Sequence, residues 1–320
     1  MSLSETVSPS VSAHPPERLS PAQRVTAQIK AALERGVRPW TKPWDDGAPG
    51  FVLPRRSNGL AYRGVNVVAL WAASVEHGFR SPFWFTFKQA LAHDAAVRKG
   101  ERGSYVVFYA EKKADAETAD DGDDTNVRRI LRGYSVFCAD QIDGLPAHLY
   151  APPPPPVPVD AREAELVALL ERAGARVLHG GPRAYYDMAA DLIRLPERAS
   201  FRDAGSYLAT RAHELGHWTR APSRLDRDFG QKRFGDHGYA LEELTAELCA
   251  AMLGAVLGFP GEHVEDHAAY IASWLSALDA MPSAFLSAAG KAQAATDYLL
   301  QRMGHEDAGP LESGAKPEMN

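Results

Sequence analysis

One pentapeptide restricts the fold of this chain more than any other feature. Residues 213–217 read His-Glu-Leu-Gly-His, the pattern H-E-x-x-H. On an α-helix, side chains at positions i and i+4 lie one turn apart on the same face. His213 and His217 can therefore direct two imidazoles at one metal ion, while Glu214 offers a carboxylate that can take a proton from a water held there. The pattern predicts a helix that lines the site of a metal-dependent hydrolase.

The residues around the motif favour a helix. Residues 206–219 contain no proline, and Leu208 and Leu215 fall on the face opposite the two histidines. Such a helix can bury one side and present the other side to a cleft. The alternative is that both histidines are ordinary solvated or hydrogen-bonded core side chains without a metal.

A metal site of this kind needs a third protein ligand. The metzincin pattern does not supply it, because Arg220 and Ser223 stand where that pattern has glycine and histidine. The segment 239–248 places Glu243 and Glu247 one helical turn apart. We expect Glu243 to be the metal ligand and Glu247 to accept the free N–H of a ligating histidine.

The acidic residues of this second helix have other possible interpretations. Glu242 lies about 100° around the helix from Glu243 and is the less favoured ligand. All three glutamates could form a solvated face, but residues 244–257 are largely apolar, and buried carboxylates are costly unless a cation compensates them. Two imidazoles and a carboxylate suit Zn²⁺, and Mn²⁺ or Co²⁺ are not excluded.

The composition bounds the class of protein. A chain of 320 residues is long enough for two domains. It has no apolar run of membrane-spanning length and no N-terminal stretch that resembles a secretory signal. Its two cysteines, Cys138 and Cys249, lie far apart, which argues against a disulfide framework or a cysteine zinc site. We expect buried thiols in a cytoplasmic protein.

The net charge of −6 conceals an asymmetry. Residues 20–113 contain 15 Lys and Arg against 7 Asp and Glu. An acidic run at 115–124 follows and reads as a solvated loop. This division indicates that the first part of the chain meets a polyanion.

A run of prolines divides the chain. Residues 151–158 form a stiff, extended spacer in the favoured interpretation, although such a run can also be a ligand for partner domains. We expect an α+β protein with two domains: a small α/β domain at 20–150 and a mainly helical domain at 160–303. Residues 151–159 would be the linker, and residues 1–19 and 304–320 would be disordered.

The first domain should begin with a helix. Ser20, Pro21 and Gln23 form a capping set, and Gly36 ends the helix. A second, apolar helix is predicted at 67–75, and strands are predicted at 83–87, 105–109 and 129–137, the last two paired through the acidic loop.

Aromatic and basic residues alternate in the loops of this domain. Single-stranded nucleic acid is bound by such sets, because bases stack on aromatic rings and guanidinium groups hold phosphates. The alternative is that the tryptophans fill the core and the arginines are surface residues. The candidate contacts are Trp40, Lys42, Trp44, Arg55, Arg56, Asn58, Tyr62 and Arg63.

Several of these segments together resemble ArdC-type antirestriction proteins, and the similarity extends over nearly all of residues 22–300. The matching segments are R-P-W-T-K-P-W (38–44), P-R-R-S-N-G-L-A-Y-R-G-V-N (54–66), G-Y-S-V-F-C-A-D-Q-I-D-G-L-P (133–146), A-H-E-L-G-H-W-T (212–219), R-F-G-D-H-G-Y-A-L-E-E-L-T-A-E-L (233–248), H-A-A-Y-I-A-S-W-L (267–275) and K-A-Q-A-A-T-D-Y-L (291–299). One departure is Cys138, where the family is expected to have asparagine.

The resemblance implies an N-terminal domain that binds single-stranded DNA and a C-terminal zincin-like metallopeptidase domain. It implies a mobile-element protein that protects incoming DNA from host restriction enzymes around conjugation. By motif, His213, Glu214, His217 and Glu243 map onto the family's metal-site residues. The arrangement also resembles peptidases that cleave phage-type repressors, in which a glutamate on the next helix is the third ligand.

Two classes of function follow. As an enzyme, the chain would cleave a peptide bond, with Glu214 as the general base and with Tyr239 or His237 as weaker candidates to stabilise the oxyanion. As a binding module, it would coat entering single-stranded DNA or occupy a restriction enzyme, and its metal would be structural. A toxin or effector built from the same modules is a weaker third option.

Overall fold

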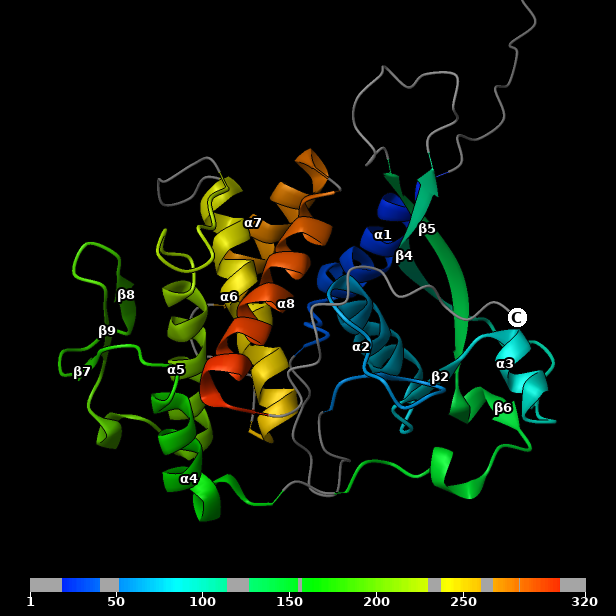
Figure 1. Cartoon of the computed structure of the whole chain (residues 1–320), viewed down its shortest axis with the longest axis horizontal. Helices are drawn as coiled ribbons and strands as arrows, with labels where there is room; N and C mark the ends of the chain where they lie inside the picture. The colour runs from blue at the N-terminus through cyan, green and yellow to red at the C-terminus, as the bar shows by residue number, and fades with distance from the viewer. Residues whose placement is uncertain are drawn as a thin grey trace, which may run out of the picture.

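The computed structural model describes residues 19–40, 52–113, 127–154, 157–229, 237–259, 267–281 and 283–305. The sheet of the first domain stands beside a helical second domain (Figure 1). The predicted α+β class is confirmed. The acidic loop and nearly all of the two predicted disordered ends lie outside the described residues. No helix in the described ranges is long and apolar enough to cross a membrane.

Helix α1, Pro21–Glu34, begins as its sequence predicts. The Ser20 hydroxyl accepts a hydrogen bond from the Gln23 backbone N–H at 3.2 Å, and the Ser20 N–H donates to the Gln23 side chain at 2.8 Å. After the helix, Gly36 has a φ of 73°, a left-handed conformation that glycine adopts without strain.

A four-stranded sheet in the order β1-β2-β5-β4 forms the centre of the first domain. Its strands are β1 (Arg55–Arg56), β2 (Phe83–Phe85), β4 (Ser104–Lys113) and β5 (Val127–Cys138). Strands β4 and β5 pair antiparallel over their length, which confirms the predicted pairing. The strand expected at 83–87 ends early, because the Thr86 side chain caps a short helix, α3 (Phe87–Ala92).

The remaining elements of the first domain flank this sheet. Helix α2, Val65–His77, packs on β4 and on α1. Two short strands, β3 (Ala96–Val97) and β6 (Ile142–Asp143), pair antiparallel, and a 3₁₀ turn, Ala139–Gln141, joins β5 to β6. A second 3₁₀ turn covers Ala147–Leu149.

The second domain is mainly helical. It contains α4 (Val159–Glu171), α5 (Ala204–Trp218), α6 (His237–Leu257), α7 (His267–Ala280) and α8 (Ala284–Met303). A small sheet in the order β7-β9-β8 is formed by β7 (Val177–His179), β8 (Tyr185–Asp187) and β9 (Leu192–Leu195). A 3₁₀ turn, Arg198–Ser200, follows it. Helix α6 packs against α5, α7 and α8, so it lies at the centre of the domain (Figure 1).

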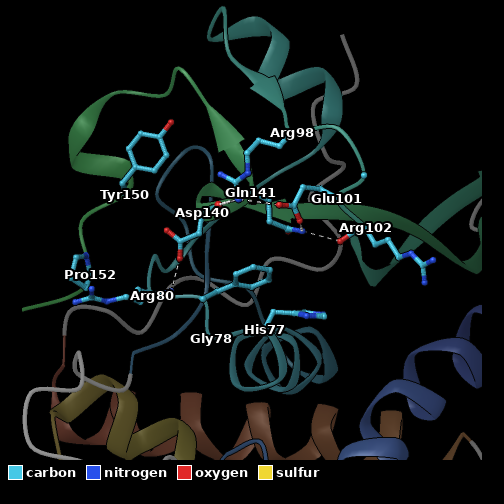
Figure 2. A pocket seen from close by; sticks show the side chains of 12 residues that line it. His77, Gly78, Arg80, Arg98, Glu101, Arg102, Asp140, Gln141, Tyr150 and Pro152 are labelled. Carbon is cyan, nitrogen blue, oxygen red and sulfur yellow. Dashed lines mark hydrogen bonds and ion pairs between the residues drawn. The ribbon is translucent and has the colours of Figure 1, made fainter.

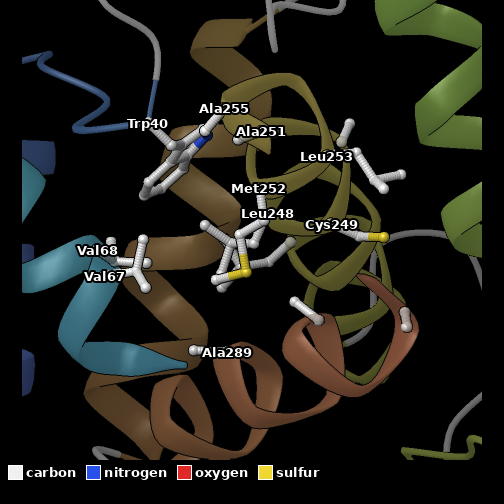
Figure 3. Packing of buried hydrophobic residues seen from close by; sticks show 14 of the residues in the cluster. Trp40, Val67, Val68, Leu248, Cys249, Ala251, Met252, Leu253, Ala255 and Ala289 are labelled. Atoms are coloured by element: carbon white, nitrogen blue, oxygen red, sulfur yellow. The ribbon is translucent and has the colours of Figure 1, made fainter. Parts of the chain in front are cut away.

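The two domains share one hydrophobic core. Val67 and Val68 of α2 belong to the same buried cluster as Met252 of α6 and Ala289 of α8 (Figure 3). The Gly64 backbone N–H, at the start of α2, also donates to the Gln293 side chain of α8 at 2.9 Å. The proline segment is therefore one of several connections between the domains.

Trp40 belongs to this shared core. Its ring is 0% exposed, and its centroid lies 5.6 Å from that of Trp274 on α7 and 6.5 Å from that of Phe285 on α8. No face of the ring is open to a base, so the expected stacking role of Trp40 is not supported. The alternative, a tryptophan that fills the core, describes this residue.

Candidate metal site and nucleic-acid interface

Helix α5 presents the H-E-x-x-H motif from a buried position. The helix begins at an Asp203 N-cap, whose carboxylate accepts from the Ser206 N–H at 2.7 Å, as N-cap residues do. His213 and Glu214 are only 5% and 4% exposed, and His217 is half-buried. The motif therefore faces another part of the protein.

The facing element is α6, which brings Glu243 to the two histidines. The Nε2 atoms of His213 and His217 lie 3.1 Å apart, and the Glu243 carboxylate oxygens lie 3.5 Å and 3.6 Å from them. Tetrahedral ligand atoms about 2.0–2.2 Å from a zinc ion lie roughly 3.3–3.5 Å from one another. The three side chains therefore fit one divalent metal ion, and among the described residues no other such group is found.

The charges at this site favour a bound cation. Burial alone would lower the pKa of His217, but the carboxylates of Glu243 and Glu242 outweigh it and raise that pKa to about 9. For His213, the effect of burial is likewise outweighed, by hydrogen bonds to Glu243 and Glu247, and its pKa is well above the ordinary value. Three carboxylates thus stabilise positive charge around two imidazoles.

Each histidine has a second carboxylate on its other ring nitrogen. Glu247 Oε2 lies 3.5 Å from His213 Nδ1, and its predicted role as acceptor of that ring's N–H stays a prediction. Glu242 Oε1 lies 3.0 Å from His217 Nδ1. Such contacts orient a ligating imidazole and fix its tautomer. The helical spacing predicts no such role for Glu242, which points away from Glu243 but reaches the second histidine.

Two buried arginines in turn hold these carboxylates, and the sequence pattern predicts neither as part of the site. Arg227 donates to both oxygens of Glu242 at 2.8 Å and 2.7 Å, and to the Gly216 carbonyl at 2.8 Å. Arg38 of the first domain lies 3.2 Å from Glu247. The only sequence signal was that buried acids on an apolar helix need counter-charges.

Helices α5 and α6 are in close contact at Gly216, inside the motif. A Cβ atom there would lie 3.1 Å from the Ala246 Cα and 3.3 Å from its carbonyl oxygen. A side chain at this position would have to push α6 away, and Glu243 lies on α6. Glycine therefore permits the two helices to bring their ligands together.

We expect Gly216→Ala to lower the free energy of unfolding by about 1–3 kcal/mol, the usual cost of overpacking. The matched control is Gly290→Ala on α8, where an added Cβ meets no atom within 4 Å. That control should be neutral or stabilising by up to about 1 kcal/mol, because alanine favours helix. Urea denaturation measures both. Equal stability of the two variants would show that the close approach imposes no constraint.

Comparisons with known proteins agree with this geometry. Residues 20–137 match the N-terminal domain of anti-restriction factor ArdC, and residues 164–291 match a zincin-like metallopeptidase domain. The crystal structure of the metal-free antirestriction protein ArdC from plasmid R388 superposes with a TM-score of 0.74 and 42% sequence identity, over 88% of this chain and 97% of that chain. The chain belongs to the ArdC antirestriction family.

Other relatives extend the comparison. A Mn(II)-bound structure of the R388 ArdC protein is 39% identical, with a TM-score of 0.74, and covers 92% of this chain and 100% of that one. The uncharacterized protein y4eC of Sinorhizobium fredii is 43% identical over 87% of this chain and 90% of its own length. DNA primase TraC of Escherichia coli is 38% identical over 87% of this chain, which corresponds to 26% of the primase.

Within the ArdC-type N-terminal domain, the structure does not gather all eight predicted DNA contacts. Lys42 and Trp44 lie outside the described residues. Tyr62 is 3% exposed, so its ring is not offered to a base, and burial raises its pKa well above the ordinary value. Like Trp40, it is better explained as a core residue. Arg63 forms an ion pair with Asp297 of α8.

The remaining candidates are Arg55 and Arg56 in strand β1 and Asn58 on the turn that follows it. Arg55 and Asn58 are exposed, and Arg56 lies over the Tyr62 ring with its guanidinium 5.6 Å from the centroid. Arg55 Nη1 donates to the Gly59 carbonyl at 2.9 Å, which leaves its other nitrogens for a phosphate. The positive φ of Gly59, 86°, is what permits this turn. This region thus offers arginine side chains for phosphates rather than exposed aromatic rings for stacking on bases.

Tyr239 and His237 lie in the first turn of α6, and Tyr239 precedes Glu243 by one helical turn. His237 is exposed and Tyr239 is half-buried. Their suggested role at an oxyanion stays a prediction.

Proposed function

We propose that this chain is an antirestriction protein of a mobile element that binds single-stranded DNA through its first domain and hydrolyses peptide bonds at a divalent-metal site in its second. The observation that carries the second part is the convergence of His213, His217 and Glu243 on one point, with Glu214 next to the first ligand. The ArdC family membership supports the antirestriction role.

The residues of the site have distinct tasks. Bound Zn²⁺ would act as a Lewis acid toward a peptide carbonyl and lower the pKa of a water. Glu214 would take the proton from that water and pass it to the leaving amine, and such acid–base catalysis contributes about 10²–10⁴-fold. Glu242 and Glu247 hold the imidazoles of His217 and His213 in the ligating orientation.

Zn²⁺ is proposed because two imidazoles and one carboxylate are its usual protein ligands in hydrolases. Mn²⁺ and Co²⁺ remain alternatives, and one of the two crystal structures of the R388 relative has Mn(II) bound.

A second candidate is a DNA-binding module with a structural metal. The observation in its favour is burial, because His213 and Glu214 are almost inaccessible, and structural metal sites are closed whereas catalytic ones keep an open position. In that case the protein would protect entering DNA simply by binding to that DNA or to a restriction enzyme.

The DNA-binding part is tested by the salt dependence of affinity. Wild-type protein should bind an oligothymidylate more weakly as salt rises, because each phosphate contact releases counterions. Arg55→Ala with Arg56→Ala should reduce the slope of log affinity against log salt by about 1.4, the value for two contacts to single-stranded DNA. Fluorescence anisotropy measures this.

A matched control removes two exposed arginines from the second domain, Arg176 and Arg183. It lowers the net charge by the same amount and should leave the slope unchanged. Absence of binding by the wild-type protein would defeat the proposal for the first domain. An identical slope in the Arg55/Arg56 variant would remove these two arginines from the interface.

A further inference from the structure

The first domain contains a cavity that neither the metal site nor the turn after β1 explains. Its volume is about 690 Å³, a size typical of sites for small ligands. Four separate segments form its walls: residues 77–80 at the end of α2, residues 98–102 before β4, residues 140–141 after β5, and Tyr150 with Pro152 (Figure 2). Residues 140–141 belong to the segment 133–146, which carries the family resemblance but has so far no role.

One acidic group of the cavity wall is held by the protein itself. Glu101 accepts a hydrogen bond from Arg98 at 3.0 Å and another from the Gln141 side chain at 2.8 Å. The hydrogen bond from Gln141, followed by that from Arg98, keeps the pKa of Glu101 below its ordinary value. The Gln141 side chain is itself fixed, because its Oε1 accepts from the Cys138 backbone N–H at 2.9 Å. This side of the cavity is therefore rigid and internally neutralised.

The other acidic group, Asp140, accepts hydrogen bonds from the protein backbone, whereas two arginines of the cavity have no carboxylate partner among the described residues. The Asp140 carboxylate accepts from the backbone N–H groups of Arg80 at 2.5 Å and Ser81 at 3.0 Å. The guanidinium groups of Arg80 and Arg102 pair with no carboxylate among the described residues. Figure 2 shows these two side chains extending toward opposite sides of the cavity. Arg80 and Arg102 thus place one positive charge at each end of the cavity, and the Asp140 carboxylate lies on the same wall.

Two aromatic side chains, His77 and Phe79, also line the cavity, and His77 lies between the two arginines in the view of Figure 2. His77 is exposed at the end of α2, and its ring is inclined at 39° to that of Phe79, with the centroids 5.3 Å apart. Histidine and phenylalanine rings are surfaces on which unstacked bases settle in single-stranded nucleic acids. One positive charge at each end and two aromatic side chains in the wall suit one nucleotide of a continuing strand better than a single phosphate ion.

We propose that this cavity binds one nucleotide of single-stranded DNA, with its base against His77 and the flanking phosphates at Arg80 and Arg102. This rests on the proposed function of the first domain. The cavity adjoins strand β1, which carries Arg55, because the Arg55 N–H donates to the carbonyl of Pro82, two residues after Arg80, at 2.7 Å. One strand can thus follow both features.

The test compares the double variant Arg80→Ala/Arg102→Ala with the control double variant Arg176→Ala/Arg183→Ala. Affinity for a labelled oligothymidylate is measured by anisotropy over a series of salt concentrations. The cavity variant should lose about 1.4 from the slope and roughly tenfold in affinity near 0.1 M salt. The control should match wild type. The lysine double variant, Arg80→Lys/Arg102→Lys, should keep most of the slope, because it retains both charges.

Two further measurements locate the base and the ligand class. His77→Ala should weaken binding about fivefold or more at every salt concentration, because stacking is not a counterion effect. Inorganic phosphate and deoxycytidine monophosphate, added as competitors, should displace the oligonucleotide only weakly. Strong displacement by either would show a site for a small anion and overturn the strand assignment.

The failures are distinguishable. A wild-type protein that binds no oligothymidylate refutes the proposed function of the first domain and this inference with it. A wild-type protein that binds, together with a cavity variant that equals the control, refutes the cavity alone. Arg80 and Arg102 are exposed, so both variants should fold, which circular dichroism and a melting curve check.

Discussion

Glu214→Gln is expected to retain its metal and lose peptide cleavage by about 10²–10⁴-fold, the usual contribution of a general acid–base group. The amide has almost the same shape as the carboxylate but cannot accept a proton from water. The three ligand side chains, His213, His217 and Glu243, are unchanged, so the metal should stay. Metal content by mass spectrometry and cleavage of an unfolded protein substrate are the two measurements.

The control for this prediction is His217→Ala, which removes a ligand and should lose both metal and cleavage. Cleavage that survives Glu214→Gln would exclude Glu214 as the base. Restriction of incoming DNA in cells that express the Glu214→Gln protein then separates the two candidate functions. Loss of protection favours proteolysis, whereas full protection favours a binding module with a structural metal.

The metal site could be predicted from the sequence because its main constraint is local. Spacing i, i+4 on one helix fixes two imidazoles without any knowledge of the fold. The pair Glu243 and Glu247 on the next helix followed from the same periodicity. Their carboxylates lie 3.5–3.6 Å and 3.5 Å from histidine nitrogens, and their roles at a metal stay predictions. The capping box at Ser20 was readable for the same reason.

What the sequence did not reveal depends on contacts between distant segments. Trp40 and Tyr62 are aromatic side chains of the type that stacks on bases, but both rings are buried. Nothing local distinguishes a tryptophan that binds DNA from one that fills a core formed by α7 and α8. Arg38 contacts Glu247 across 209 residues of chain, which no spacing rule anticipates. The shared core of the two domains was missed likewise, because a proline spacer suggested separate modules.

Arg227→Met is expected to lower the free energy of unfolding by about 3–5 kcal/mol, because it leaves the Glu242 carboxylate buried without its partner. Arg227 and Glu242 are each 4% or less exposed, so water cannot replace the lost contacts. The arginine holds the pKa of Glu242 at about 2 against the effect of burial, which would raise it. Urea denaturation of the metal-free protein measures the loss.

The design of this experiment separates charge from packing. Glu242→Gln in the same chain should recover part of the stability, because the double variant has no unpaired buried charge. Arg172→Met, at an exposed position after α4, is the matched control and should change stability by less than about 0.5 kcal/mol. A loss in Arg227→Met no larger than in the control would mean that Glu242 does not depend on this arginine.

The same variant tests how far the metal site depends on its outer contacts. Without Arg227, Glu242 loses the cation that keeps it ionised and the hydrogen bonds that direct its carboxylate toward His217 Nδ1. Metal affinity should then fall by about 10–100-fold, as it does when the partner of a ligating histidine is lost. An unchanged affinity would show that α5 and α6 alone hold His217 in place, through the close approach at Gly216.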